Sequence, residues 1–208
     1  MNVQSSFDYL LKIIIVGDSA VGKSNFLFRF VEGKFSQIYQ TTVGSDTKSK
    51  ICTLPKIKKN VKLQLWDTAG QERYMSINKI FFQKVQGIIL MYDITQRESF
   101  ENLQKWTKLI NETTFNVPVV LVGNKIDNEE ERIVRIEEGE NYAQDNGYLF
   151  YEASALNGKN VDNVLYDLSE KIVSNFESSF SMTLNESDFI DFKSTKKDKN
   201  NNTKEKCC

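Results

Sequence analysis

A short glycine-bearing segment between an apolar run and an amphipathic segment restricts the possible folds of this chain more than any other feature. Residues 17–24 read Gly-Asp-Ser-Ala-Val-Gly-Lys-Ser and fit the pattern G-x-x-x-x-G-K-[ST]. The apolar residues 10–16 predict a β-strand before it, and residues 22–31 predict an amphipathic helix after it. A strand, this loop and a helix, in that order, are the structural context that a phosphate-binding loop requires.

The residue types of this segment suit the binding of phosphate. Gly17 and Gly22 let the backbone wrap around a phosphate with successive N–H groups pointing inward, and the following helix N-terminus adds positive potential. Lys23 supplies a charge for the β- and γ-phosphates, and the Ser24 hydroxyl is a magnesium ligand in such loops. The alternative is a strand–helix turn without a ligand, and a chance match has odds of about one in a hundred. The motif alone selects neither ATP nor GTP. The candidate nucleotide-binding residues are Gly17, Asp18, Ser19, Ala20, Val21, Gly22, Lys23 and Ser24.

Short apolar runs alternate with longer amphipathic segments along the chain. The uniformly apolar residues 87–92 are typical of a strand that is covered on both faces. The alternation predicts an α/β fold with a mostly parallel six-stranded sheet, right-handed crossovers and helices on both faces. Thr95 and Glu98 have the spacing of a capping box at the start of one helix. The expected strands are 10–16, 49–54, 61–66, 87–92, 117–122 and 148–153, and the expected helices are 22–31, 99–111 and 161–176.

Composition excludes several classes of function. The chain has 208 residues with 27 basic and 28 acidic side chains, so its net charge of −1 gives no field that favours nucleic acid. The absence of histidine excludes Ser-His-Asp triads and histidine-ligated metal sites. Three cysteines, two of them terminal, cannot form a disulfide framework, and this usage indicates a reducing, intracellular compartment. No apolar run is long enough to span a bilayer, and the N-terminus lacks the pattern of a signal peptide.

The periodic patterns are confined to one part of the chain. Residues 10–176 form the expected domain, residues 1–9 are a short N-terminal extension, and residues 177–208 are expected to be a flexible tail. Within the tail, residues 193–208 carry six lysines, two acidic residues and almost no apolar side chains. Such a segment cannot bury enough apolar surface to offset its ordering entropy, which predicts disorder.

Two loops are candidates for base recognition. Strand 117–122 leads into Asn124, Lys125 and Asp127, and ligands in open α/β sheets sit beyond the carboxyl ends of strands. The Asp127 carboxylate can accept from both N1–H and the 2-amino group of guanine, whereas adenine would present a lone pair to it. A polar turn after a strand is the alternative interpretation. At the end of the last strand, the backbone N–H groups of residues 154–156 can meet guanine O6; these are Ser154, Ala155 and Leu156.

A third group of residues suits phosphate hydrolysis. Asp67 follows strand 61–66, where it is placed to hold magnesium through water. The Gly70 amide can approach the γ-phosphate closely, and Gln71 can orient a water in line with it. Either Thr41 or Thr42, in the polar segment 35–44, can reach magnesium, and geometry does not choose between them. Taken by itself, that segment is better explained as an ordinary surface loop.

In this order and spacing, these segments resemble the small Ras-like GTPases over residues 10–176. The resemblance implies a P-loop NTPase fold, the Ras-like G domain. Within that superfamily the chain is similar to the Rab family, through residues 62–66, 73–77 and 90–95 and the ending Cys207-Cys208.

The resemblance assigns roles that the residues alone leave open. It implies that Thr42 is the magnesium-binding switch threonine, with magnesium also held by Ser24 and Asp67. Phe35 matches the aromatic residue that packs on guanine, and Tyr39 the one that closes over the phosphates. The catalytic residues implied are Gln71, Lys23 and Thr42.

The resemblance also implies a biological role. Rab proteins are monomeric switches of vesicle trafficking that cycle between GDP and GTP forms and hydrolyse GTP slowly without a partner. The implied partners are a guanine nucleotide exchange factor, a GTPase-activating protein, GTP-dependent effectors, the prenylation machinery and a carrier of the GDP state. The ending is not C-a-a-X, so the resemblance implies double geranylgeranylation of Cys207 and Cys208. The implied location is the cytoplasmic face of intracellular membranes, with a cytosolic pool.

Some positions depart from the Rab pattern. Ala20 stands where the loop usually has glycine, Thr47 replaces an expected phenylalanine of an effector patch, and Leu156 replaces a lysine.

Two other functions remain as alternatives. An ordinary P-loop kinase or ATPase would need a substrate lid, for which little chain length remains. A binding module without turnover would have lost key residues such as Lys23 or Gln71, and both are present.

Overall fold

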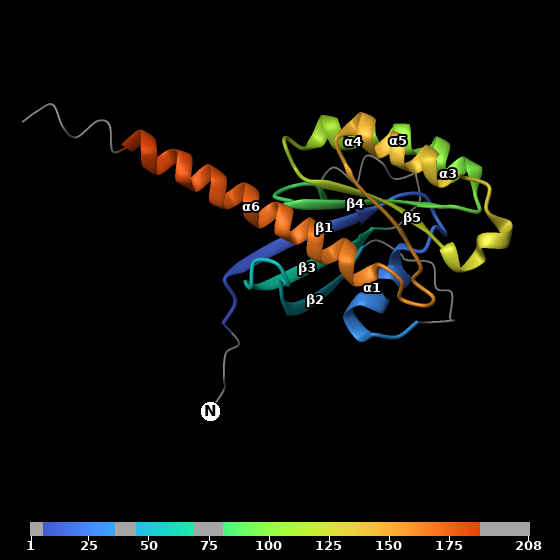
Figure 1. Ribbon diagram of the computed structural model, residues 1–208, viewed down its shortest axis with the longest axis horizontal. Coiled ribbons are helices and arrows are strands. Elements are labelled where there is room, and N and C mark those ends of the chain that lie inside the picture. Colours follow the sequence, from blue (N-terminus) through green and yellow to red (C-terminus); the bar gives the residue numbers. More distant parts are fainter. Residues whose placement is uncertain (1–5, 36–44, 69–80, 188–208) are drawn as a thin grey trace, which may run out of the picture. The chain divides into compact units, whose positions relative to one another are not determined.

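The computed structural model describes residues 6–35, 45–68 and 81–187, which Figure 1 draws as coloured ribbon. The chain divides into two compact units, Met1–Val173 and Ser174–Cys208. All strands lie in the first unit, which also contains the predicted phosphate and base loops.

A six-stranded sheet in the order β2-β3-β1-β4-β5-β6 forms the centre of the first unit. Strand β2 is antiparallel to β3, and every other neighbouring pair is parallel. The predicted fold class is therefore confirmed. The strands are β1 (Tyr9–Val16), β2 (Ser45–Thr53), β3 (Asn60–Thr68), β4 (Gly87–Asp93), β5 (Val119–Asn124) and β6 (Leu149–Ala153).

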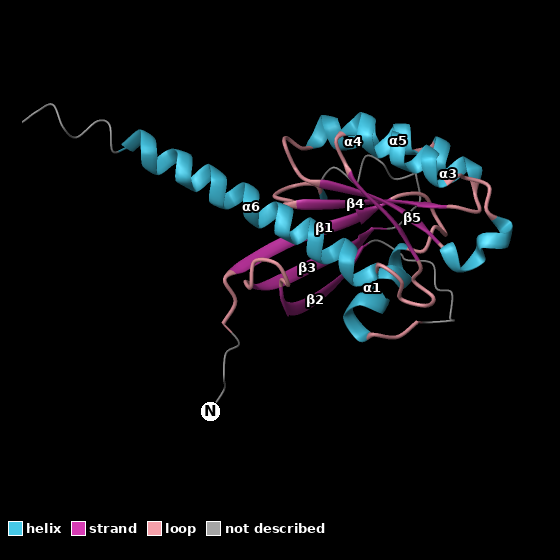
Figure 2. Cartoon of the chain, viewed as in Figure 1, coloured by secondary structure: helices cyan, strands magenta, loops and turns pink. Residues whose placement is uncertain are grey.

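Helices cover both faces of the sheet, as Figure 2 shows. One apolar core contains buried residues of α1 (Lys23–Glu32) and of the first part of α6 (Val161–Ser187). The other core contains buried residues of α4 (Leu103–Thr113) and α5 (Ile136–Asn146). All seven residues of β4 are buried, as expected for a strand between two helical layers.

The helices differ from the sequence-based expectations in several places. The expected helix 99–111 is two helices, α3 (Arg97–Glu101) and α4, which meet at Asn102. The capping-box prediction is wrong, because the Thr95 N–H and hydroxyl both donate to Asp93 Oδ1 and α3 begins after Gln96. Helix α6 continues past residue 176 to Ser187, since extending a formed helix costs far less than nucleating one.

Helix α5 and the 3-10 helix η2 (Ile126–Glu131) were not predicted. The buried residues of α5 are Gly139 and Ala143, so this helix buries no large apolar side chain of the kind that makes a periodic pattern visible. Among the described residues, no helix is both long and apolar enough to cross a membrane.

Strand register places the predicted site loops together at the carboxyl ends of the parallel strands. Asp67 of β3 lies opposite Ile15 of β1, one residue before that strand ends. Asn124, at the end of β5, pairs in register with Asp93 of β4 and with Ala153 of β6. The carboxyl ends of five parallel strands therefore face the same region, where α/β folds bind ligands.

Candidate nucleotide-binding site

The phosphate loop has a backbone conformation that requires glycine at two positions. Gly17 has φ 140°, and a Cβ there would lie 2.1 Å from the main-chain oxygen of Met91. Gly22 has φ 101°, and its Cβ would lie 2.4 Å from Asn124 Nδ2. The loop therefore packs against both β4 and the candidate base loop with no room for side chains. Ala20 also has a left-handed backbone, with φ 64°, which costs an L-residue roughly 1–2 kcal/mol and explains why glycine suits this position.

Lys23 is held inside this loop. Its side chain is buried, and Nζ donates to the carbonyl oxygens of Gly17 at 2.9 Å and Asp18 at 2.6 Å. These carbonyls fix the ammonium group against the loop at the N-terminus of α1. Positive charge and helix N–H groups are thus brought together, which is the arrangement that binds anions.

Asp18 has a side-chain role that sequence reasoning missed. Its Oδ1 accepts a hydrogen bond from Trp106 Nε1 at 2.8 Å, and its Oδ2 accepts one from Asn102 Nδ2 at 2.7 Å. Both donors belong to the start of α4 and the break before it. The carboxylate therefore anchors the phosphate loop to the helical layer. No local pattern could have revealed this contact, because 84 residues or more separate the partners.

Asn124 joins the phosphate loop to the loop after β6. Its side chain is 1% exposed. The Nδ2 group donates to the carbonyl of Val21 at 2.8 Å, and Oδ1 accepts from the backbone N–H of Ala155 at 3.2 Å. One amide thus fixes the phosphate side and the base side of the candidate site relative to each other.

Asp127 and Ser154, predicted separately as base-site residues, lie in direct contact. The Ser154 hydroxyl donates to Asp127 Oδ1 and also accepts from the backbone N–H of Asn157 at 3.1 Å. This contact orients the carboxylate that we expect to read guanine. The neighbouring Lys125 has φ 72°, and its Nζ lies 2.6 Å from Oδ2 of the fully buried Asp93.

Arg132, which belongs to none of the predicted motifs, connects the segment after β5 to the end of β6. Its guanidinium donates to both carboxylate oxygens of Glu152, at 2.6 and 2.8 Å, and to Glu129 at 2.7 Å. The hydrogen bonds that Arg132 donates to Glu152, and then those to Glu129, raise the pKa of Arg132, and the same bonds lower the pKa of Glu129. The segment after β5 is therefore tied to the end of β6 by a charged network that stays intact at neutral pH.

The described residues of the expected magnesium site fit that ion. Asp67 is buried at the end of β3, where the adjacent Thr68 hydroxyl donates to the Ile15 carbonyl at 2.7 Å. Ser24 is the second residue of α1, directly after Lys23. One carboxylate and one hydroxyl suit magnesium, which keeps several waters and takes further ligands from substrate phosphates.

Phe35 is described, and it packs partly buried against the core that contains α1 and α6. The remaining switch and tail predictions lie outside the described residues; these are Tyr39, Thr41, Thr42, Gly70, Gln71, Cys207 and Cys208.

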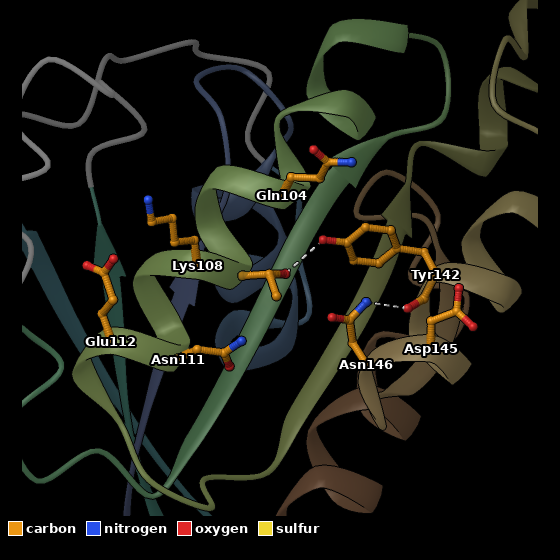
Figure 3. Close-up of a pocket in the computed structure, with 8 residues that line it drawn as sticks. Gln104, Lys108, Asn111, Glu112, Tyr142, Asp145 and Asn146 are labelled. Carbon is orange, nitrogen blue, oxygen red and sulfur yellow. Dashed lines mark hydrogen bonds between the residues drawn. The ribbon is translucent and has the colours of Figure 1, made fainter.

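Figure 3 shows a groove lined by residues of α4 and α5. Its lining is polar, and the Thr107 and Tyr142 hydroxyls are hydrogen-bonded across it at 2.8 Å. Asn146 Nδ2 donates to the Tyr142 carbonyl at 2.8 Å. None of the predicted site residues lines this groove.

Comparison with known proteins agrees with the fold. The model of the Ras family matches residues 12–174. The chain is 48% identical over 151 residues to the Ras-related protein Rab-3B of Homo sapiens, covering 72% of this chain and 68% of the relative. It is 45% identical over 157 residues to Rab-3C of Bos taurus (75% and 68%) and 44% identical over 168 residues to Rab-3D of Homo sapiens (80% and 76%).

The fold and the family match together define a P-loop nucleotide hydrolase with a Ras-like G domain. The chain belongs to the Ras family and, within it, to the Rab-type small GTPases, which hydrolyse GTP and regulate vesicle trafficking.

Proposed function

We propose that this Rab-type GTPase binds GDP and GTP, with Mg²⁺, at the loops described above. The observation that carries the proposal is Asn124, whose single buried amide bonds to both the phosphate loop and the loop after β6. The proposed nucleotide-binding residues are Gly17, Asp18, Ser19, Ala20, Val21, Gly22, Lys23, Ser24, Phe35, Tyr39, Thr42, Gly70, Asn124, Lys125, Asp127, Ser154, Ala155 and Leu156.

Guanine selectivity rests on Asp127. Its carboxylate accepts from the two adjacent donors of guanine, and the hydrogen bond from Ser154 supports its orientation. A site built around hydrogen bonds to one base rejects an analogue that cannot make them by roughly 10⁴-fold or more.

The experiment exchanges the preferred base. We expect Asp127→Asn to weaken GTP binding severely and to improve binding of xanthosine triphosphate, because the amide donates to the oxygen that xanthine carries at position 2. Competition against a fluorescent nucleotide measures both affinities. Asp145→Asn, on the distant helix α5, is the matched control. Unchanged GTP affinity in the Asp127 variant would refute the assignment of the base site.

Magnesium is proposed to be held by Ser24, Thr42 and Asp67, where it would neutralise phosphate charge. The Ser24 ligand serves both nucleotide states, whereas Thr42 engages only with the γ-phosphate present. We therefore expect Ser24→Asn to favour the GDP-bound or empty form. Thr42→Ala should spare GDP binding but abolish effector capture; if Thr41→Ala does so instead, the proposed assignment is shifted by one residue.

Hydrolysis is proposed to use Gln71 to position the attacking water, with Lys23 and Thr42 contacting the γ-phosphate. An arginine at the γ-phosphate contributes about 10³–10⁵ in rate. No arginine occurs between Arg29 and Arg73, so the first switch segment contains none. A GTPase-activating protein is therefore needed for fast turnover, and Gln71→Leu should hold the GTP form. Single-turnover hydrolysis near one per second without a partner contradicts this proposal.

The remaining partners follow from the proposed switch. An exchange factor loads GTP, effectors bind the GTP form, and a soluble carrier withdraws the lipidated protein in its GDP form. Residues 10–176 are the proposed GTPase domain, after an N-terminal extension at 1–9 and before a flexible tail at 177–208.

The tail is proposed to carry two geranylgeranyl chains on Cys207 and Cys208. One lipid chain gives only marginal, reversible membrane binding, so stable anchoring takes two signals. Six lysines from residue 193 onward add attraction to the anionic cytoplasmic leaflet. Replacing both cysteines with serine should move the protein from membranes to the cytosol without changing GTP hydrolysis. The intact mass of the native protein checks lipidation, and a mass without added lipid contradicts it.

A further inference from the structure

Arg29, in the last turn of α1, connects that helix to the loop after β6. Its guanidinium donates to three main-chain carbonyls: Nε to Ala155 at 2.9 Å, Nη1 to Gly33 at 3.0 Å, and Nη2 to Leu156. Ala155 and Leu156 lie in the proposed base loop, whereas Gly33 is the C-cap of α1, two residues before Phe35. One side chain therefore holds segments that the sequence separates by 126 residues.

The bond to Ala155 determines where the next backbone N–H points. The Ala155 carbonyl and the Leu156 N–H belong to the same planar trans peptide unit, so they point in opposite directions. Because the carbonyl is held toward Arg29, the Leu156 N–H is directed away from it. The Ala155 N–H, in the preceding peptide unit, donates to Asn124 Oδ1. Arg29 and Asn124 thus fix two successive peptide units of this loop.

Only arginine can make this set of contacts. A guanidinium presents five N–H donors in a rigid planar fork, whereas a lysine ammonium is a single nitrogen on a flexible stem. Three carbonyls on two segments need several donors that point in different directions, and the planar guanidinium provides them. The arginine stem also passes Gly158, where a Cβ would lie 3.6 Å from Arg29 Cδ.

We propose that Arg29 is a specificity-determining positioning residue, which aims the Leu156 N–H at O6 of guanine without touching the nucleotide. This inference rests on the proposed assignment of residues 154–156 to the base site. Without the guanidinium, the peptide unit is free to rotate, and the energetic preference for an oxygen acceptor at position 6 falls. Asp127 accepts from N1–H and the 2-amino group independently of Arg29, so recognition of these two donors remains when Arg29 is replaced.

The test compares three nucleotides on two arginine variants. GDP has O6 and the 2-amino group; 6-thioguanosine diphosphate replaces O6 with a weakly accepting sulfur; inosine diphosphate keeps O6 but lacks the 2-amino group. Dissociation rates of all three are measured from the full-length protein with Mg²⁺, in the wild type, Arg29→Met and Arg29→Lys. Arg97→Met is the matched control, since Arg97 is half-exposed and ion-paired with Glu101 and Glu138 instead.

We expect Arg29→Met to accelerate GDP dissociation roughly ten- to hundredfold, the effect of losing hydrogen bonds to a charged donor. The preference for GDP over the 6-thio analogue should fall toward one, and the preference for GDP over inosine diphosphate should stay. Arg29→Lys should give the same pattern, and it keeps the test available if the methionine variant does not fold.

If dissociation of all three nucleotides is accelerated equally and the preference for oxygen over sulfur is unchanged, the proposal is overturned, and Arg29 only stabilises the packing of α1 against the loop after β6. No acceleration in either variant would overturn it as well. Failure of the proposed base site itself has a different signature, because the wild type would then not discriminate against inosine diphosphate at all.

Discussion

Replacement of Asn124 by alanine tests the connection between the phosphate loop and the base loop. The variant removes a donor to the Val21 carbonyl and an acceptor for the Ala155 N–H, both at a position that is 1% exposed. A buried polar group left without a partner costs about 1–3 kcal/mol, so two such groups cost about 2–6 kcal/mol. Water entering the space vacated by the amide reduces this cost, and we expect about 2–4 kcal/mol.

This energy should appear in nucleotide binding, because both loops contact the nucleotide in the proposed site. A loss of 2–4 kcal/mol corresponds to roughly 30- to 1,000-fold weaker GDP binding. The assay is the dissociation rate of fluorescent GDP, with the urea midpoint of the GDP-bound protein as the measure of stability. Asn146→Ala is the control, since this exposed amide donates to the Tyr142 carbonyl of its own helix. Equal GDP dissociation rates in the two variants would refute the reasoning.

Three further predictions concern other parts of the same unit. Gly17→Ala should lower the free energy of unfolding by several kcal/mol and prevent nucleotide binding. Gly33 has φ 67° and nothing within 4 Å of an added Cβ, so Gly33→Ala should lower it by only about 1–2 kcal/mol in thermal denaturation. Trp106→Phe removes the indole N–H bonded to the phosphate loop and should destabilise the protein by about 1–3 kcal/mol in urea, with faster GDP release. A hydrogen bond from Arg97 lowers the pKa of Glu138 below its usual 4.5, so the ionised carboxylate stabilises the fold above pH 4.5, and this contribution is lost as the pH falls. In acid denaturation, Glu138→Gln should therefore lose less stability with falling pH than the wild type does.

Local sequence patterns predicted where several candidate site residues lie in the fold. Lys23 could be placed because strand, loop and helix follow one another within a short stretch. Asn124 and Asp127 could be placed because parallel strands end at one edge of the sheet, so residues just after them gather there. Such predictions need only the order of the elements along the chain.

The residues that sequence reasoning missed act through long-range contacts. Asp18 was predicted only as one of the residues of the phosphate loop, yet its carboxylate accepts a hydrogen bond from Trp106, 88 residues away. Arg29 sits on an otherwise ordinary amphipathic helix, and its contacts with the Ala155 and Leu156 carbonyls are known only once β6 is packed beside β5. A three-carbonyl contact leaves no pattern in the sequence, because main-chain carbonyls occur at every residue.

The helix boundaries were missed for a different reason. The break at Asn102 separates α3 from α4 with backbone angles that remain helical, so the apolar pattern runs through it. Small buried residues in α5, together with many exposed charges, hide that helix from a search for apolar periodicity. In both places packing against the sheet decides the structure.

The central claim is that these loops form a guanine-specific nucleotide site. The most direct measurement is displacement of fluorescent GDP from the full-length protein by unlabelled GDP and by ADP, with Mg²⁺ present. We predict that GDP competes at least roughly 10⁴-fold more effectively than ADP, because Asp127 offers acceptors where adenine has no donors. Comparable competition by the two nucleotides would contradict the account.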